Sequence, residues 1–201
     1  MGAANASVGF FDRQFRRQIE AGDYALNPFE AATLPFLRGD VLDLGCGLGN
    51  LALAAARQGA RVTALDASEA AVEDLRRRAA QAGLRIDARA AQLRDWRPGR
   101  EWDAVACIGL LMFLPPGAAR AGLVAVRDAV RAGGVAAVNV LVEGTTYLEM
   151  FDPAGHCLFE PGELGRAFAG WTPLHASTDA FRAPGGTSKR FETLVVRRPG
   201  A

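Results

Sequence analysis

The sequence predicts one α/β domain built on a doubly wound, mainly parallel sheet. Between residues 41 and 142, short apolar runs alternate with longer segments of helical periodicity. The short runs are largely apolar on both faces, as strands are when helices cover both sides of a parallel sheet. The chain has 201 residues, of which 50% are hydrophobic. This length and composition suit a single domain with a sizeable core.

The expected elements follow one another in alternation along this core. Strands are predicted at residues 41–44, 62–65, 85–90, 104–107 and 135–142, and helices at residues 51–57, 69–81 and 118–131. After the core, the residues Pro161-Gly162-Glu163-Leu164 open a short helix. Two extended runs, 172–181 and 190–197, then flank the turn Pro184-Gly185-Gly186. We expect these two runs to form a terminal antiparallel hairpin.

About 38 residues precede the first predicted strand, and they are rich in aromatic side chains. The aromatic residues of this segment are Phe10, Phe11, Phe15, Tyr24, Phe29 and Phe36. The segment is expected to form one or two helices with a bend at Asn27-Pro28. Because large apolar side chains must be buried somewhere, residues 1–38 are predicted to be a helical arm or lid over the main domain, residues 39–201.

Composition argues against several classes of partner. Lys and Arg total 23 and Asp and Glu total 22, so the net charge of +1 offers no broad basic field for nucleic acid. The three cysteines are widely spaced, which indicates free thiols in a reducing compartment and neither a metal nor a redox pair. Neither an apolar stretch of ~20 residues nor a signal-peptide pattern is present. We expect a cytoplasmic protein without a membrane partner, and the oligomeric state stays open.

A glycine-rich turn follows the first predicted strand directly. Residues Val41–Gly49 read V-L-D-L-G-C-G-L-G. Glycine allows the backbone to turn tightly and lets a ligand approach the main chain, where a Cβ would collide with it. A P-loop would end in Gly-Lys-Ser/Thr, and the dinucleotide fingerprint needs glycine where Asn50 stands. The turn therefore predicts a nucleotide-type site of another kind at the carboxyl end of the first strand.

An aspartate closes the second predicted strand. Asp66 lies 17 residues after Gly49, a position that faces the ribose of a ligand in doubly wound sheets. Its carboxylate can accept hydrogen bonds from both ribose hydroxyls. The alternative is that Asp66-Ala67-Ser68 caps the helix that starts at Glu69.

Taken together, Val41–Gly49 and Asp66 resemble the cofactor signature of class I S-adenosylmethionine-dependent methyltransferases, a resemblance that covers residues 40–142. Three later blocks resemble the tellurite-resistance methyltransferase family within that class. They are L-M-F-L at 111–114, F-E-P-G-E-L at 159–164 with G-W at 170–171, and R-F-E-T at 190–193. The resemblance implies a Rossmann-like sheet of seven strands, mostly parallel, with an antiparallel C-terminal strand.

The resemblance also implies a cofactor, S-adenosylmethionine, with S-adenosylhomocysteine as the product. The glycine turn would lie against the methionine part, Asp43 would orient the turn or reach the amino group, and Asp66 would bind the ribose. Where the family carries an acid for the adenine amino group, this chain has Gln92, with Asp95 as the alternative. Cys107 and Ile108 are expected either along the cofactor or in the core. The residues predicted to bind the cofactor are Tyr24, Asp43, Gly45, Cys46, Gly47, Gly49, Asp66, Ala67, Gln92, Leu93, Cys107 and Ile108.

The chain departs from the tellurite-resistance family in two places. Asn27-Pro28 replaces a Thr-Arg pair, so the carboxylate clamp of that Arg is absent, and Tyr24 is expected either to contact the cofactor or to pack on the helices. The His-Arg pair before the last strand is replaced by T-D-A-F-R at 178–182, which argues against tellurite or selenite as substrate.

No catalytic residue is predicted, because in-line methyl transfer to a good nucleophile depends chiefly on positioning. His156 is expected to be either a substrate contact or a surface-loop residue, and His175 is expected to be structural. The sequence thus predicts methyl transfer from S-adenosylmethionine to a small-molecule acceptor. The alternative is a cofactor-binding regulatory module without turnover.

Overall fold

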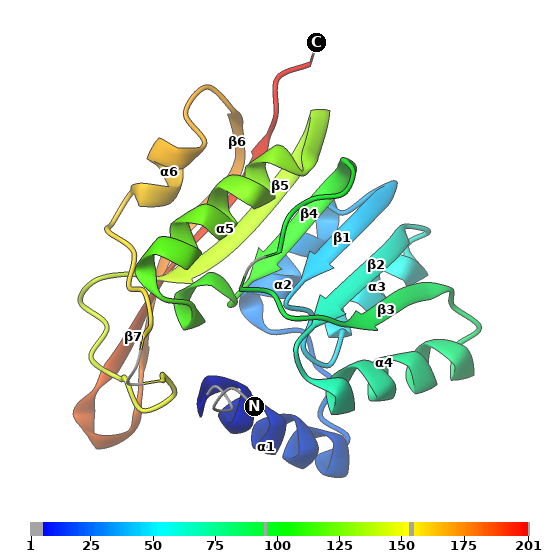
Figure 1. The fold of residues 1–201 in the computed structure, drawn as a ribbon, viewed down its shortest axis with the longest axis horizontal. Coiled ribbons are helices and arrows are strands. Elements are labelled where there is room, and N and C mark those ends of the chain that lie inside the picture. The colour runs from blue at the N-terminus through cyan, green and yellow to red at the C-terminus, as the bar shows by residue number, and fades with distance from the viewer. Residues whose placement is uncertain (1–5, 95, 153–154, 201) are drawn as a thin grey trace.

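A computed structural model describes residues 6–94, 96–152 and 155–200 of the chain. Its centre is one seven-stranded sheet (Figure 1). The strands are β1 (Asp40–Leu44), β2 (Arg61–Asp66), β3 (Ile86–Ala90), β4 (Trp102–Ile108), β5 (Val130–Leu141), β6 (Thr172–Arg182) and β7 (Ser188–Arg197). The strand order is β3-β2-β1-β4-β5-β7-β6, and β7 runs antiparallel to both β5 and β6. The predicted fold class is confirmed.

Six α-helices and three short 3-10 turns accompany the described strands. The α-helices are α1 (Ala6–Ala21), α2 (Pro28–Thr33), α3 (Asn50–Arg57), α4 (Glu69–Gln81), α5 (Pro116–Asp128) and α6 (Glu163–Ala167). The 3-10 turns are η1 (Leu34–Phe36), η2 (Leu111–Phe113) and η3 (Pro184–Gly186). The bounds of α4 equal the prediction. Its N-cap is Ser68, whose hydroxyl accepts a hydrogen bond from the amide of Ala71 at 3.2 Å.

The boundary between α5 and β5 differs from the prediction. The helix ends at Asp128 and the strand begins at Val130, whereas the sequence predicted a helix to residue 131 and a strand from residue 135. The backbone amide of Trp102 donates to the carbonyl of Ala129 at 2.8 Å, which brings the chain into the sheet early. Arg131 then forms an ion pair with Asp103 at 3.0 Å. Runs of alanine and valine suit both periodicities, so this boundary depends on tertiary contacts.

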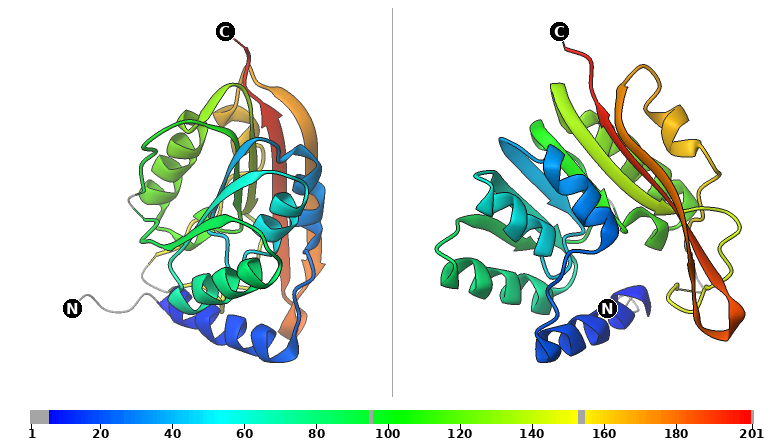
Figure 2. Two further views of the ribbon diagram at one scale, coloured as in Figure 1. Left: turned by 90° about the vertical axis from the view of Figure 1, so that its right-hand side faces the viewer. Right: turned by 180° about the vertical axis from the view of Figure 1, so that it is seen from behind.

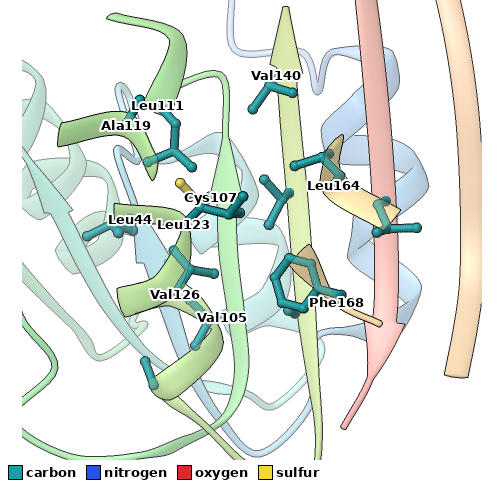
Figure 3. Packing of buried hydrophobic residues seen from close by; sticks show 14 of the residues in the cluster. Leu44, Val105, Cys107, Leu111, Ala119, Leu123, Val126, Val140, Leu164 and Phe168 are labelled. Atoms are coloured by element: carbon teal, nitrogen blue, oxygen red, sulfur yellow. The ribbon is translucent and has the colours of Figure 1, made fainter. Parts of the chain in front are cut away.

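Two apolar layers lie on opposite faces of the sheet. On one face, α5 and α6 pack on the strands through residues such as Leu123, Val126 and Leu164 (Figures 1 and 3). On the other face, α3 and α4 bury Leu51 and Leu75, and Figure 2 shows α2 and α3 on that side. Neither layer covers the carboxyl ends of the parallel strands, which is where doubly wound folds bind their ligands.

Helix α1 belongs to neither layer. It lies across the carboxyl ends of the parallel strands, as Figures 1 and 2 show from three directions. The arm predicted for residues 1–38 is thus represented by α1, α2 and η1 in the described part of the chain. In that part, no helix is both long and apolar enough to cross a membrane.

Candidate functional site

A cavity of about 1130 Å³ lies at the carboxyl ends of the parallel strands, between the sheet edge and α1. The segments that follow β1, β2, β3 and β4 form one half of its wall. The other half comes from α1, α2, η2, the end of β5 and the start of β7. The strand order changes direction between β1 and β4, where open α/β sheets bind their ligands. The volume lies slightly above the roughly 300–1,000 Å³ of a typical small-molecule pocket.

The glycine turn after β1 has a backbone that only glycine adopts easily. Gly45, Gly47 and Gly49 have φ angles of +78°, +51° and +69°. The amide of Gly45 donates to the carbonyl of Leu65 at 2.8 Å, and the amide of Gly47 donates to Oδ2 of Asp66 at 2.8 Å. The turn is therefore fixed to the end of β2 on the floor of the cavity.

The sequence predicted that a ligand lies next to these glycines. In the structure, protein side chains are their nearest neighbours. A Cβ at Gly47 would lie 3.1 Å from the ring of Phe15, so this glycine permits the close approach of α1. A Cβ at Gly49 would lie 2.5 Å from the buried side chain of Leu75, so that glycine serves the packing of α4. Gly45, Cys46 and Gly47 line the cavity, as predicted for cofactor contacts. Gly49 does not line the cavity and instead lies against Leu75 of the core.

Asp66 links the glycine turn to the start of α4. Its Oδ1 accepts from the amide of Ser68 at 2.8 Å, and its Oδ2 accepts from Gly47. The segment Asp66-Ala67-Ser68 does cap α4, and the capping residue in it is Ser68 and not Asp66. Burial raises the pKa of Asp66, and the backbone hydrogen bonds oppose that rise. Asp66 and Ala67 both line the cavity, and each carboxylate oxygen keeps a lone pair for a ligand.

A second carboxyl group lies beneath the turn. Asp43 is only 3% exposed, and its Oδ2 has no hydrogen-bond partner among the residues that the structure describes. Burial, and then the negative charges of Glu30 and Asp66, raise the pKa of Asp43 to about 8. Asp43, a predicted cofactor contact, does not itself line the cavity, and its Oδ2 is a buried acceptor atom that the described residues leave unused.

Glu30 is a cavity residue that the sequence reasoning missed. It lies in the first turn of α2, where Asn27 and Glu30 form a reciprocal capping box with hydrogen bonds of 2.8 and 2.9 Å. Burial raises the pKa of Glu30. Both residues line the cavity. The spacing Asn27-x-x-Glu30 is readable from the sequence and was the signal that could have placed Glu30 here.

The charged residues of the described cavity wall are mainly acidic. The acidic ones are Asp12, Glu30, Asp66 and Asp152, and the basic ones are Arg94 and Lys189. A wall of this kind favours a ligand that carries positive charge. No group of three or more His, Cys, Asp or Glu side chains that could hold a metal ion occurs within residues 6–94, 96–152 and 155–200.

The remaining predicted contacts divide between the cavity and the core. Gln92, Leu93 and Ile108 line the cavity, at the ends of β3 and β4. Cys107 is fully buried among the residues packed by α5, as Figure 3 shows, so the core interpretation holds for it. The alternative adenine contact, Asp95, lies outside the described residues.

Tyr24 does not reach the cavity, which corrects the prediction that it contacts the cofactor. It lines a smaller hollow on the outer side of α3 and α4, where the Arg78 guanidinium stacks 4.0 Å from the ring centre. Arg78 is held in place by Asp74 at 2.7 Å, by Asn50 at 3.2 Å and by the carbonyl of Leu48. Because this anchored cation offers the ring a cation–π contact, Tyr24 packs on the helix layer.

His156 lies in the loop between β5 and α6. Its ring stacks on Phe151, with 4.4 Å between ring centres and 9° between planes. The neighbouring Gly155 lines the cavity, whereas His175 lies on β6 in the sheet. The stacked arrangement favours a structural role for His156 in forming the loop.

Part of the chain is similar to known methyltransferases. Residues 41–134 match the family described as "Methyltransferase domain". A ubiquinone biosynthesis O-methyltransferase of Xylella fastidiosa is 35% identical over 102 residues, which are 48% of this chain and 42% of that protein. The chain therefore aligns with less than half of this curated relative.

Solved structures share the fold across most of the chain. The crystal structure of TehB from Haemophilus influenzae superposes with a TM-score of 0.77 at 18% identity, over 90% of this chain and 65% of that one. The Burkholderia thailandensis 1,6-didemethyltoxoflavin-N1-methyltransferase gives a TM-score of 0.69 at 22% identity, over 98% and 91% of the two chains. Identities this low show the common fold, and the family match is confined to residues 41–134. Together the comparisons support a class I S-adenosylmethionine-dependent methyltransferase.

Proposed function

We propose that this protein transfers a methyl group from S-adenosylmethionine to a small-molecule acceptor bound in the same cavity. The observation that carries the proposal is one cavity of about 1130 Å³ that borders the glycine turn on one side and an apolar wall on the other. S-adenosylmethionine supplies a methyl group on a positively charged sulfonium, which makes that methyl electrophilic. The chain's own residues then have to bind both molecules and align them.

The residues of the first half of the cavity fit that cofactor. Asp43, which is buried next to this half without lining the cavity, and Glu30 of α2 on the facing wall supply negative charge that suits the positively charged amino group of the methionine part. Asp66 and Gln92 both line the cavity, where Asp66 would accept hydrogen bonds from the ribose hydroxyls and the side-chain carbonyl oxygen of Gln92 would accept one from the adenine amino group. A ligand cation would favour the ionised carboxylates and so lower their raised pKa values.

Alignment is the contribution that this site makes to the reaction. In-line displacement needs the attacking atom about 3 Å from the methyl carbon, and holding it there supplies much of the acceleration. The apolar residues of α1 and η2 form the cavity wall opposite the strand ends, and closure of this wall over bound ligands would keep water from the reacting atoms. No residue is assigned as a general base.

A small molecule as acceptor is supported by two observations. The curated relative from Xylella fastidiosa is named for methylation in ubiquinone biosynthesis, although only 42% of it is aligned. The neighbour from Burkholderia thailandensis was crystallised with 1,6-didemethyltoxoflavin and S-adenosylhomocysteine.

The N-terminal arm acts as a lid in this proposal. Helix α1 contributes Phe10, Phe11 and Phe15 to the cavity wall. The ring of Phe11 meets Phe113 edge-on with 4.7 Å between centres. The carbonyl of Ala25 accepts a hydrogen bond from Asn50 at 3.3 Å, so the arm is attached beside the glycine turn. Residues 1–38 would open and close over the binding domain formed by residues 39–201.

The test is turnover. The purified protein is incubated with S-adenosylmethionine and a panel of phenols, amines and thiols, and S-adenosylhomocysteine is measured by mass spectrometry. We expect S-adenosylhomocysteine and methylated acceptor in equal amounts for at least one compound. Cofactor binding without turnover across the panel would favour the alternative, a regulatory module of the same fold.

A further inference from the structure

The second half of the cavity has a wall of aromatic and aliphatic side chains. Six of the residues that line it are Phe10, Phe11, Phe113, Leu141, Met150 and Phe191. They come from α1, η2, the end of β5, the following loop and the start of β7. The rings are packed against one another, since Phe113 also lies 5.2 Å from Phe151, centre to centre. A preformed apolar wall of this kind suits a flat, mainly apolar ligand.

The charges near this wall do not suit an inorganic oxyanion. Such an anion needs several N–H donors converging on its oxygens. Of the described wall, Lys189 supplies one cation, and its ammonium lies 4.7 Å from the ring centre of Tyr147. Asp152 and Glu30 add negative charge on the same cavity. The wall thus favours an organic acceptor.

One buried polar side chain interrupts the apolar wall. Asn139 of β5 is 1% exposed and lines the cavity. Its Nδ2 donates to Oγ1 of Thr193 on β7 at 2.9 Å, which fixes the amide group. Its Oδ1 has no hydrogen-bond partner among the described residues. A buried acceptor left unpaired is costly, so a ligand donor placed there is favoured.

The position of Asn139 is also informative. Asn139 pairs with Ile108 across β4 and β5, and Ile108 lines the cofactor half of the cavity. The amide of Gly109 donates to the backbone carbonyl of Asn139 at 3.1 Å. Asn139 therefore stands where the two halves meet, which is where an acceptor's reacting end must lie if a methyl group passes between them.

We propose that the methyl acceptor is a flat, mainly apolar organic molecule carrying a hydroxyl or N–H group, and that Asn139 binds that group through Oδ1. The inference rests on the proposed methyl transfer and adds the substrate class and the residue that selects it. The donor group of the acceptor satisfies the buried carbonyl oxygen, while its ring packs against the phenylalanines.

The test uses 2-naphthol and 2-methoxynaphthalene, two ligands of similar shape of which only the first has a donor. Calorimetry measures each with the protein saturated with S-adenosylhomocysteine. We expect 2-naphthol to bind roughly tenfold tighter or more, the effect of one hydrogen bond to a buried acceptor. The double variant Asn139→Leu with Thr193→Val should lose this preference. It removes both polar partners and leaves no new unpaired group.

The single variant Thr193→Val is the matched control, because it keeps Oδ1 of Asn139 and should retain most of the preference. Equal affinities of the wild type for the two naphthalenes, binding of neither, or a preference that survives in the double variant would each overturn the inference. So would selenite binding that displaces 2-naphthol. Affinity for S-adenosylhomocysteine is measured first on every protein. Its absence refutes the proposed function, whereas its presence without the preference refutes only the acceptor assignment.

Discussion

The two halves of the cavity are built by different physical means. In the first half, backbone amides, glycine conformations and the carboxylate of Asp66 form a hydrogen-bonded floor at the strand ends. In the second half, side chains from α1, η2 and β7 form an apolar wall around the single amide of Asn139. From this difference we infer how one fold can serve several acceptors. The polar site at the strand ends can stay the same for a shared cofactor, while the side chains of the apolar wall select the acceptor.

The largest expected effect comes from Gly47→Val, because Gly47 lies in the glycine turn and faces Phe15 of α1. The residue has a φ angle of +51°, and the new side chain would press on Phe15 of α1. Strain of about 1–3 kcal/mol in the turn and displacement of α1 should abolish measurable binding of S-adenosylhomocysteine.

The matched control for this variant is Gly83→Val. Gly83 has a similar φ of +66°, but a Cβ there would meet open space, and it lies in the turn after α4. Its strain is comparable, so both variants should lose stability in thermal unfolding. Only Gly47→Val should lose the ligand, and normal affinity in that variant would give the turn another role.

The next largest effect separates ligand binding from helix capping. Asp66→Ala should weaken S-adenosylhomocysteine by about 1.5–3 kcal/mol, roughly 10- to 150-fold, because a charged acceptor is lost. Ser68→Ala removes the true cap of α4 and should lower stability by ~1 kcal/mol with little change in affinity. Calorimetry and chemical unfolding of both variants give the comparison. If Ser68→Ala weakens the ligand as much as Asp66→Ala does, the ribose role is wrong.

A third effect concerns pH. Asp43 has a pKa of about 8 in the folded protein and about 3.9 in an unfolded chain, so the folded state binds the proton more tightly. Its contribution to stability is complete below about pH 3.9 and is lost as pH rises through about 8. Asp43→Asn should therefore flatten the fall in the free energy of unfolding between pH 6 and 8. Glu30 and Asp66, whose pKa values are also raised, should leave a smaller residual slope.

The features that the sequence predicted are those fixed by local constraints. The bounds of α4 follow from its periodicity and from Ser68, and the glycine turn follows from backbone geometry. Asn139 was not found, because its importance depends on Thr193, 54 residues away in the sequence. Tyr24 was misplaced for the same reason, since only the fold brings Arg78 to its ring.

The smallest expected effect is a change in dynamics of the arm. If α1 and the segment after it close over the ligand, amide exchange across residues 23–29 should slow when S-adenosylhomocysteine is added. Exchange in the middle of α5, on the outer face of the sheet, should stay the same and serves as the internal control. Exchange in residues 23–29 that ignores the ligand would contradict the lid. Deleting the residues before Leu26 should also weaken cofactor binding without unfolding the sheet.

The polar half of the cavity is expected to bind S-adenosylmethionine and not a dinucleotide. Parallel calorimetric titrations of the wild-type protein with S-adenosylhomocysteine and with NAD test it directly. We expect one molecule of S-adenosylhomocysteine to bind per chain. NAD should bind much more weakly, because Asn50 stands where the dinucleotide fingerprint needs glycine. Tighter binding of NAD than of S-adenosylhomocysteine would contradict this expectation.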